Sequence, residues 1–308
     1  MPSPTEDHCF LSPSFAISAQ LEIALRYEQA GLAPRALAAY RAAFEASGDT
    51  AERAGILLRV ARVHRTANAW EDTLRESREA LRLAEHAGAD DIAAEAMNVE
   101  VGVHLLRGDF RAGEELARRA LVRAISPRVR GMLLQNLGVI AARERDFAAA
   151  DRFFSDSVDA FRAANYDLGL AIALNNASAA ARDAGSADRA LAFAHEATEL
   201  GRRIDAIDVV VLAVENQAHA LMLLGRYDEA EMALGESLGH FAVTGNALRQ
   251  AECLEIMGAL HESRNENREY ALRCYRRATD LAQSVGDRVL VERLAAHMAR
   301  LGVALAPV

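Results

Sequence analysis

The feature that most constrains this chain is a pattern that recurs along nearly its whole length. Pairs of small side chains stand seven positions apart within segments that begin 37 or 40 residues after one another. A chain that repeats a segment of this length folds as stacked copies of one supersecondary unit, because a single unit cannot bury its apolar face alone. The pairs are Ala36 and Ala43, Thr73 and Ala80, Ala150 and Ser157, Ala190 and Ala197, Ala230 and Ser237, and Ala271 and Ala278.

Each unit is predicted to be two helices. The composition is 51% hydrophobic but only 6% aromatic, and no proline occurs from Arg35 to Ser126 or from Arg128 to Ala306. Strands prefer β-branched and aromatic residues, so the expected fold is all-α. Another small residue lies midway along each first helix, where the second helix approaches closely. These residues are Ala24, Ala61, Gly138, Ser178, Ala218 and Gly258.

The turns between paired helices carry their own signals. Glycine occurs there at Gly31, Gly108, Gly185 and Gly225, where a left-handed residue ends a helix at low cost. An aromatic residue often follows, as at Trp70, Phe110, Phe147 and Tyr227. At the junctions between units, Gly48-Asp49, Gly245-Asn246 and Gly286-Asp287 are predicted to place a C-capping glycine before an N-cap residue.

With these residues the chain resembles the tetratricopeptide repeat family, in a variant with repeats of about 40 residues. The resemblance implies a right-handed α-solenoid of about seven repeats, spanning 16–287. Residues 1–15 are expected to be a flexible N-terminal segment, and 288–308 a capping helix and tail that cover the open apolar end. The repeats start near residues 17, 54, 94, 131, 171, 211 and 251.

Composition and motifs argue against catalysis and cofactors. All 35 basic residues are arginine, which excludes a lysine nucleophile, a lysine base or a P-loop. Cys9, Cys253 and Cys274 form neither a disulfide framework nor a zinc motif, and Cys253 and Cys274 are expected in the core. His64 and His261 are also expected in the core. We therefore predict a protein that is not an enzyme and binds no metal or cofactor.

The sequence gives weaker indications of the cellular location, the partners and the source of the protein. Residues 1–14 have neither the basic start nor the apolar run of a signal peptide, and no stretch is long and apolar enough to span a bilayer, which predicts a cytoplasmic protein. A net charge of −9 makes nucleic-acid binding an unfavourable hypothesis. The arginine- and alanine-rich, lysine-free composition suggests a bacterial source.

The resemblance implies that the first helices line the concave surface. Residues spaced four, three and four apart share one stripe of a helix, and we call the stripe that begins one residue into each repeat the inner stripe. Its predicted peptide-binding residues are Met132, Asn136, Val139 and Arg143 in repeat 4, Ile172, Asn176 and Asp183 in repeat 5, Leu212, Asn216, His219 and Leu223 in repeat 6, and Arg59 and Arg62 in repeat 2.

Asn136, Asn176 and Asn216 recur at steps of 40 residues. An amide offers both a donor and an acceptor, which suits contact with an extended peptide backbone. Similar asparagine ladders occur in tetratricopeptide proteins that clamp peptides. Two alternatives stay open: the asparagines tie adjacent helices together, or duplication copied an innocuous residue. Arg59 and Arg62, with Arg65 nearby, form either a site for a carboxylate or phosphate or a solvated helix face.

Two functions follow from different classes. The leading hypothesis is a non-enzymatic scaffold or adaptor whose groove, centred on repeats 4 to 6, binds a peptide segment of a partner protein. The alternative is a regulatory sensor for a small effector or signalling peptide, since long repeats with Gly-Asp junctions resemble the helical sensor regions of bacterial transcription activators. Self-association through the end faces is a third possibility.

Overall fold

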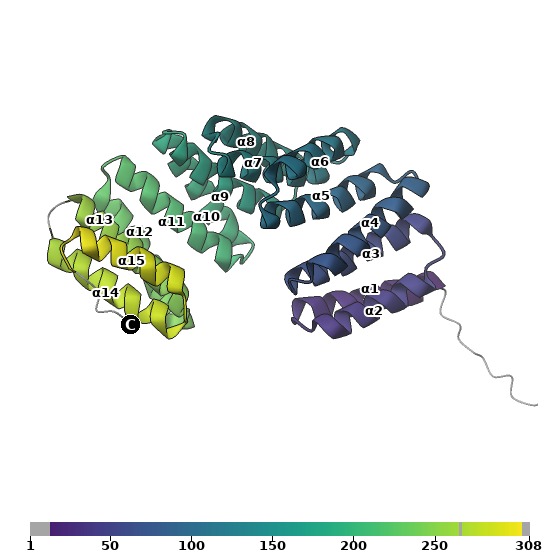
Figure 1. The fold of residues 1–308 in the computed structure, drawn as a ribbon, viewed down its shortest axis with the longest axis horizontal. Coiled ribbons are helices and arrows are strands. Elements are labelled where there is room, and N and C mark those ends of the chain that lie inside the picture. Colours follow the sequence, from purple (N-terminus) through teal and green to yellow (C-terminus); the bar gives the residue numbers. More distant parts are fainter. Residues whose placement is uncertain (1–12, 265–266, 304–308) are drawn as a thin grey trace, which may run out of the picture. The chain divides into compact units, whose positions relative to one another are not determined.

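The structure, a computed structural model, describes residues 13–264 and 267–303 (Figure 1). These residues form helices joined by short turns, and no strand occurs among them. The predicted flexible segment 1–15 lies mostly outside the described residues, and the first helix already begins at Pro13. The helices are α1 Pro13–Gln29, α2 Ala33–Ala46, α3 Thr50–Thr66, α4 Trp70–His86, α5 Asp90–Arg107, α6 Phe110–Arg123, α7 Pro127–Arg143, α8 Phe147–Ala163, α9 Asp167–Asp183, α10 Ala187–Arg203, α11 Ile207–Leu223, α12 Tyr227–Thr244, α13 Ala247–Arg264, α14 Arg268–Ser284 and α15 Arg288–Arg300.

Odd-numbered helices up to α13 are the first helices of the repeats. Their starting residues are separated by the same steps of 37 and 40 residues that the sequence shows. The two shorter steps have a simple cause. Both α2 and α6 have 14 residues, whereas the second helices of the other repeats have 17 or 18. Each short helix ends on an extended residue, Ser47 or Ala124.

Small side chains allow the paired helices to approach closely, as the sequence predicts. The small residues of the first helices and of the second helices are all buried. Ser178 on α9 also donates a hydrogen bond of 2.7 Å to the carbonyl of Ala190 on α10. Gly258 on α13 lies against the ring of Tyr275, so closely that an added Cβ would stand 2.5 Å from Cε1. Close approach therefore depends on the absence of bulk at these positions.

The glycine caps follow the prediction with one correction. Gly31, Gly108, Gly185 and Gly225 are left-handed, with φ between 69° and 82°, and Gly245 and Gly286 are left-handed at the junctions. Gly48 is not among the left-handed residues. The end of α2 does not need a left-handed residue, because the extended Ser47 leaves the helix and donates its N–H to the Ala43 carbonyl. The N-cap role of Asp49 is confirmed by its bond of 2.6 Å from the Glu52 N–H.

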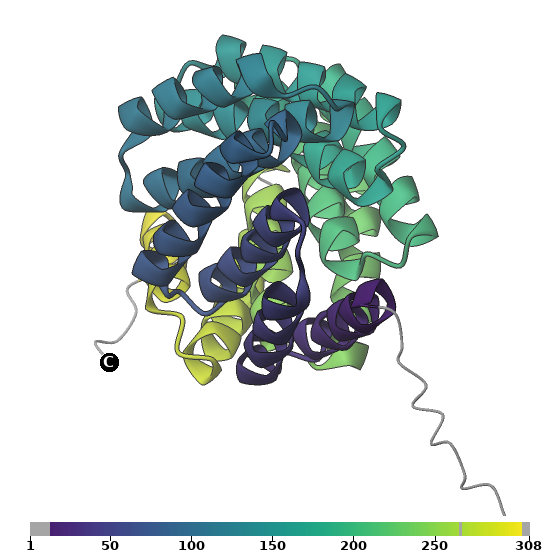
Figure 2. The ribbon, with the colours of Figure 1, turned by 90° about the vertical axis from the view of Figure 1, so that its right-hand side faces the viewer.

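The chain divides into two compact units, residues 1–144 and 145–308. The first unit holds α1 to α7, in which α1 packs on α2, α3 on α4 and α5 on α6, and α7 packs against α5 and α6 (Figure 1 and Figure 2). The second unit holds α8 to α15, with α9 packed on α10 and α13 on α14. The division falls in the turn between α7 and α8, inside the fourth repeat.

The last helix closes the second unit. Leu290, Leu294 and Met298 of α15 are buried and join the core formed by α11 to α14. Within the described residues, no helix is long and apolar enough to cross a membrane.

Candidate functional site

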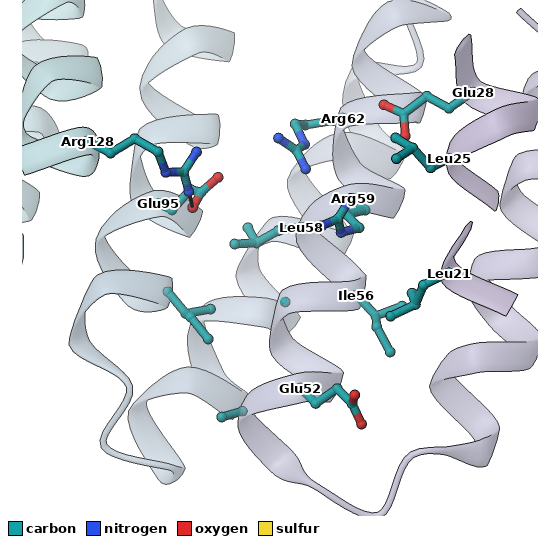
Figure 3. Close-up of a pocket in the computed structure, with 13 residues that line it drawn as sticks. Leu21, Leu25, Glu28, Glu52, Ile56, Leu58, Arg59, Arg62, Glu95 and Arg128 are labelled. Atoms are coloured by element: carbon teal, nitrogen blue, oxygen red, sulfur yellow. Dashed lines mark hydrogen bonds and ion pairs between the residues drawn. The ribbon is translucent and has the colours of Figure 1, made fainter. Parts of the chain in front are cut away.

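The first helices of the first unit enclose a groove of about 640 Å³, which we call the first-unit groove. Figure 3 shows it between α1 and the helices α5 and α7, with α3 at its centre. Both apolar and charged side chains line it. The lining residues are Leu21, Leu25, Glu28, Ala51, Glu52, Gly55, Ile56, Leu58, Arg59, Arg62, Ile92, Glu95 and Arg128.

Two predicted residues, Arg59 and Arg62, reach this groove from α3 (Figure 3). Among the described residues, no carboxylate forms an ion pair with either of them, and the buried Nε of Arg62 has no hydrogen-bond partner. Desolvation and, secondarily, the charge of Arg62 lower the pKa of the neighbouring Arg65. The inner stripe of α3 therefore carries two guanidinium groups that form no ion pair among the described residues, in a groove whose lining holds three arginines and three glutamates.

The carboxylates around the groove are already engaged. Glu28 accepts a hydrogen bond of 2.6 Å from the Tyr40 hydroxyl. Burial together with this bond raises the pKa of Tyr40 to about 12, against a smaller opposing effect of the nearby Arg59. Glu52 accepts a bond of 2.5 Å from Ser47, and Glu95 forms an ion pair of 2.7 Å with Arg128. Among the described residues, only Glu95 of these three is paired with a cation, whereas Glu28 and Glu52 bond to neutral hydroxyl groups and keep their negative charge.

Two of the three predicted asparagines, Asn136 and Asn216, form hydrogen bonds to the preceding first helix. Asn136 on α7 donates from Nδ2 to Oδ1 of Asn98 on α5 at 2.8 Å. Asn216 on α11 donates in the same way to Asn175 on α9 at 2.7 Å. In both cases the tenth residue of a first helix bonds to the ninth residue of the preceding first helix. For Asn136 and Asn216, these contacts agree with the alternative in which the asparagines tie adjacent helices together. Because a primary amide can form four hydrogen bonds, they do not use up its capacity for a ligand.

The predicted inner-stripe residues of repeats 4 to 6, including the asparagines, are all at least partly accessible to solvent. Met132, Val139, Leu212 and His219 are half-buried, as are Asn136, Asn176 and Asn216, whereas Arg143, Ile172, Asp183 and Leu223 are exposed. Leu223 is 62% exposed, and a single exposed leucine does not by itself indicate a partner. The residues of repeat 4 lie in the first unit and those of repeats 5 and 6 in the second.

The second unit has a pocket of about 380 Å³ on α11, α13 and α15 that we call the second-unit pocket. Its lining includes Glu215 and His219 of α11, Glu252 and Glu255 of α13, and Arg293 of α15. Arg293 pairs with Glu255 at 2.6 Å, and Arg249 pairs with Glu252 at 2.9 Å.

Glu215 has no such partner within the described part of the chain, and its buried Oε1 accepts no hydrogen bond there. Burial, followed by the nearby Glu252 charge, raises the pKa of Glu215 to about 7. Sequence reasoning did not single out Glu215. The signal that could have found it is its register: it is the ninth residue of α11, where Asn98 and Asn175 stand in other repeats, and the tenth residue of the next first helix is Ile256, which offers no donor.

The histidines and cysteines behave as core residues where the sequence predicts it. His64 and His261 are 9% and 8% exposed, and Cys253 and Cys274 are buried free thiols. Burial raises the pKa of Cys253 to about 12 and that of Cys274 to about 11, which suppresses the reactive thiolate. Desolvation lowers the pKa of His219, with the charge of Arg182 as the next cause. No group of three metal-binding side chains occurs in the part of the chain that the structure describes.

Similarity to solved structures settles the fold. The chain superimposes over 90% of its length, with a TM-score of 0.68 and 13% identity, on a Signal Transduction ATPase with Numerous Domains protein with a tetratricopeptide repeat sensor from Pyrococcus horikoshii. This chain has the tetratricopeptide-repeat fold. It spans only 44% of the length of that protein.

Two further structures support the same fold. The apo form of the quorum sensor NprR from B. thuringiensis matches with a TM-score of 0.65 and 13% identity, covering 88% of this chain and 77% of that one. A Rap protein in complex with Competence and Sporulation Factor matches with a TM-score of 0.63 and 12% identity, covering 91% and 80%. No family model matches the sequence, and no curated protein does.

Proposed function

We propose that this chain is a non-enzymatic, cytoplasmic binding protein that holds a peptide segment of a partner protein on the faces of its first helices. The observation that carries the proposal is the first-unit groove, which places aliphatic and charged side chains side by side over about 640 Å³. Peptide ligands need both kinds of contact, since apolar pockets supply affinity and a few polar groups fix orientation. The fold supports this use of the surface: one similar structure is a Rap protein in complex with Competence and Sporulation Factor.

The predicted asparagines are the second part of the proposal, with Asn136 in the first unit and Asn176 and Asn216 in the second. Asn136 and Asn216 already bond to the preceding helix, so replacing them by alanine removes an interhelical tie as well as a ligand contact. A matched control removes the same ties from the other side. Alanine at Asn98 and Asn175 removes both side-chain acceptors and leaves Asn136, Asn176 and Asn216 in place, while the contact of 3.3 Å from Asn216 to the Asn175 carbonyl is kept.

The test is affinity capture of partner proteins, followed by mass spectrometry, with three forms of the chain. Wild type and the Asn98→Ala/Asn175→Ala variant are expected to retain the same partners, and the Asn136→Ala/Asn176→Ala/Asn216→Ala variant to lose them. Circular dichroism must show that both variants fold. Equal capture by all three forms would mean that the ladder is structural and that the binding surface lies elsewhere.

A regulatory sensor is the second candidate. It is favoured by two similar structures, one described as a tetratricopeptide repeat sensor and one as a quorum sensor. The two candidates differ in what the purified chain carries. A sensor is expected to retain a small effector or short peptide, which native mass spectrometry would detect as added mass. An adaptor is expected to show the mass of the chain alone until a protein partner is added.

A further inference from the structure

We infer that the second-unit pocket binds one primary alkylammonium group, with Glu215 as its carboxylate partner and its alkyl chain against Ile256 and Ala259. A free small amine or a lysine side chain supplies this chemistry. The pocket lies in the second unit, so the inference goes beyond the peptide-binding function proposed for the first-unit groove and does not depend on it.

The carboxyl group of Glu215 carries the inference. Glu215 comes from the middle of α11 and lines a cavity of about 380 Å³. Its Oε1 is buried and accepts no hydrogen bond among the described residues, and no arginine or histidine there forms an ion pair with it. A buried acceptor without a donor is costly. A ligand that brings both N–H donors and a positive charge removes this cost.

The charge balance of the pocket leaves room for one positive charge. The lining holds three glutamates, Glu215, Glu252 and Glu255, against the single arginine Arg293, which leaves a formal charge of −2. Arg293 pairs with Glu255 at 2.6 Å, and Arg249, from outside the lining, pairs with Glu252 at 2.9 Å. One carboxylate therefore remains to be neutralised, and a ligand with a single positive charge would balance the pocket.

The histidines of the lining do not take the place of this ligand. Desolvation, followed by the charge of Arg182, lowers the pKa of His219, which keeps its ring neutral at neutral pH. Arg182 itself pairs with Asp183 at 2.9 Å. His297 lies 3.6 Å from Glu255, which is already paired with an arginine. Neither ring therefore neutralises the remaining carboxylate.

The chemistry of the lining favours a primary ammonium over other cations. No group of three metal-binding side chains occurs within the described ranges, so a divalent ion lacks the converging ligands that it needs. Quaternary ammonium groups are held by aromatic faces, and the lining contains no phenylalanine, tyrosine or tryptophan. A primary ammonium brings three N–H donors, which suit carboxylate oxygens.

The neighbours of Glu215 offer the other contacts that such a ligand needs. The charge of Glu252 is close enough to raise the pKa of Glu215. The oxygen of Glu252 that bonds to Arg249 is Oε2, which leaves Oε1 as a second acceptor for the ammonium. Ile256 and the half-buried Ala259 form the apolar part of the lining, so a short alkyl chain is expected next to the charged group.

Binding is expected to depend on pH in a defined direction. Burial, followed by the charge of Glu252, raises the pKa of Glu215 to about 7, whereas an alkylammonium loses its proton only near about pH 10. The ammonium pairs with the carboxylate form, so its affinity should fall as the pH drops below about 7 and level off above it. The other charges that act on Glu215 are Glu255 and Arg249 of α13 and Arg293 of α15.

The experiment titrates the full chain with small ligands, and proton NMR of the ligands gives the dissociation constants. The ligands are n-butylamine, the matched neutral n-butanol, tetramethylammonium and Nα-acetyl-lysine amide. At about pH 8, n-butylamine is expected to bind at least about tenfold more tightly than n-butanol, because a charge-assisted contact is stronger than a neutral one. The tighter of n-butylamine and the lysine derivative identifies the source of the ammonium group.

Two variants and one control locate the site. Glu215→Gln is expected to reduce the preference for n-butylamine over n-butanol to less than about twofold and to remove its dependence on pH. Ala259→Leu keeps every charge and is expected to abolish n-butylamine binding, because its side chain fills the space of the alkyl chain. Glu269→Gln, at an 84% exposed side chain on α14 outside the pocket, is expected to change nothing. Circular dichroism confirms that each variant folds.

Four outcomes overturn the inference. Equal affinities for n-butylamine and n-butanol contradict an ammonium site. Equal affinities for n-butylamine and tetramethylammonium indicate attraction to acidic surface without hydrogen bonding, which contradicts it as well. A preference that survives Glu215→Gln places the cation elsewhere, and a failure of every ligand to bind removes the site altogether. Each of these outcomes leaves peptide binding by the first-unit groove intact, because affinity capture tests that function separately.

Discussion

The first-unit groove and the second-unit pocket use the same positions of a repeated helix but carry opposite unpaired charges. In the groove, the tenth residue of α3 is Arg59, and the ninth residue of the preceding first helix is Leu21. In the pocket, the ninth residue of α11 is Glu215, and the tenth residue of the next first helix is Ile256. Elsewhere the same two positions hold asparagines that bond to each other.

The difference shows how equivalent positions of repeated helices can form chemically different surfaces. Two amides at the ninth and tenth positions satisfy each other and close the contact. When an apolar residue replaces one member, the polar member that remains has lost that partner and turns into a feature of the surface. A buried polar atom without a partner is costly, so Glu215, whose buried Oε1 accepts no hydrogen bond among the described residues, is a candidate for ligand binding or for control by pH.

The first and last repeats show the opposite case, in which equivalent positions form the same hydrogen bond. Tyr40 of α2 donates to Glu28, and Tyr275 of α14 donates to Glu262 at 2.7 Å from the equivalent position. The residue packed between the helices differs, because it is Ala24 in the first repeat and Gly258 in the seventh.

The largest expected effect tests that last difference. Gly258→Ala gives the seventh repeat the side chain that the first repeat already has, but its Cβ would stand 2.5 Å from the Tyr275 ring. We expect a loss of about 3 kcal/mol in the free energy of unfolding, since the buried ring cannot move without repacking. Gly235→Ala on α12 is the control, because nothing lies within 4 Å of its added Cβ. Urea unfolding followed by circular dichroism measures both; equal stability of the two variants would contradict the close packing.

The second effect concerns pH and the pocket. The pKa of Glu215 is about 7 in the folded chain against an ordinary 4.5, so the folded state binds the proton more tightly than the unfolded state. The contribution of Glu215 to stability is therefore full below about pH 4.5 and declines as the pH rises to about 7, by about 2 kcal/mol after allowance for its partial exposure.

Glu215→Gln keeps the shape of the protonated side chain and is expected to remove this decline. The difference between the wild-type and variant stability curves, measured from about pH 4.5 to about pH 8, isolates Glu215 from the histidines and from the ion pairs of Glu252 and Glu255. Parallel curves would show that the carboxyl is solvated and not a pH-responsive group.

The third effect tests the paired asparagines. Asn136→Ala in the first unit and Asn216→Ala in the second are each expected to lower the free energy of unfolding by about 1 kcal/mol, the value of one interhelical hydrogen bond. Asn98→Ala combined with Asn136→Ala is expected to cost less than the sum of the single changes, because both remove the same bond. Additive losses would contradict the bond between the two side chains.

The smallest effect concerns the groove. Arg62→Met keeps much of the apolar stem of the side chain and removes an unpaired guanidinium, so we expect the free energy of unfolding to rise by about 0.5 kcal/mol. Arg128→Met is the contrasting variant, since it leaves Glu95 without its ion pair and is expected to lower the stability. A loss of stability in both variants would show that Arg62 has a structural partner.

Most of the architecture follows from the sequence alone. The repeated spacing of small residues predicts the paired helices, and the turn glycines other than Gly48 predict the left-handed caps. The burial of His64, His261, Cys253 and Cys274 is also predicted correctly. These features depend on local chemistry and on a period within one helix pair, both of which can be read along the chain.

The tertiary structure alone decided the character of the surfaces. The inner stripe could be placed on its helix from spacing, but a stripe does not show which residue of the next helix each side chain meets. That depends on the offset between neighbouring first helices, which brings the tenth residue of one beside the ninth residue of the one before. This offset turned Asn136 and Asn216 into interhelical ties and left Arg59, Arg62 and Glu215, among the described residues, as charged groups without an oppositely charged partner.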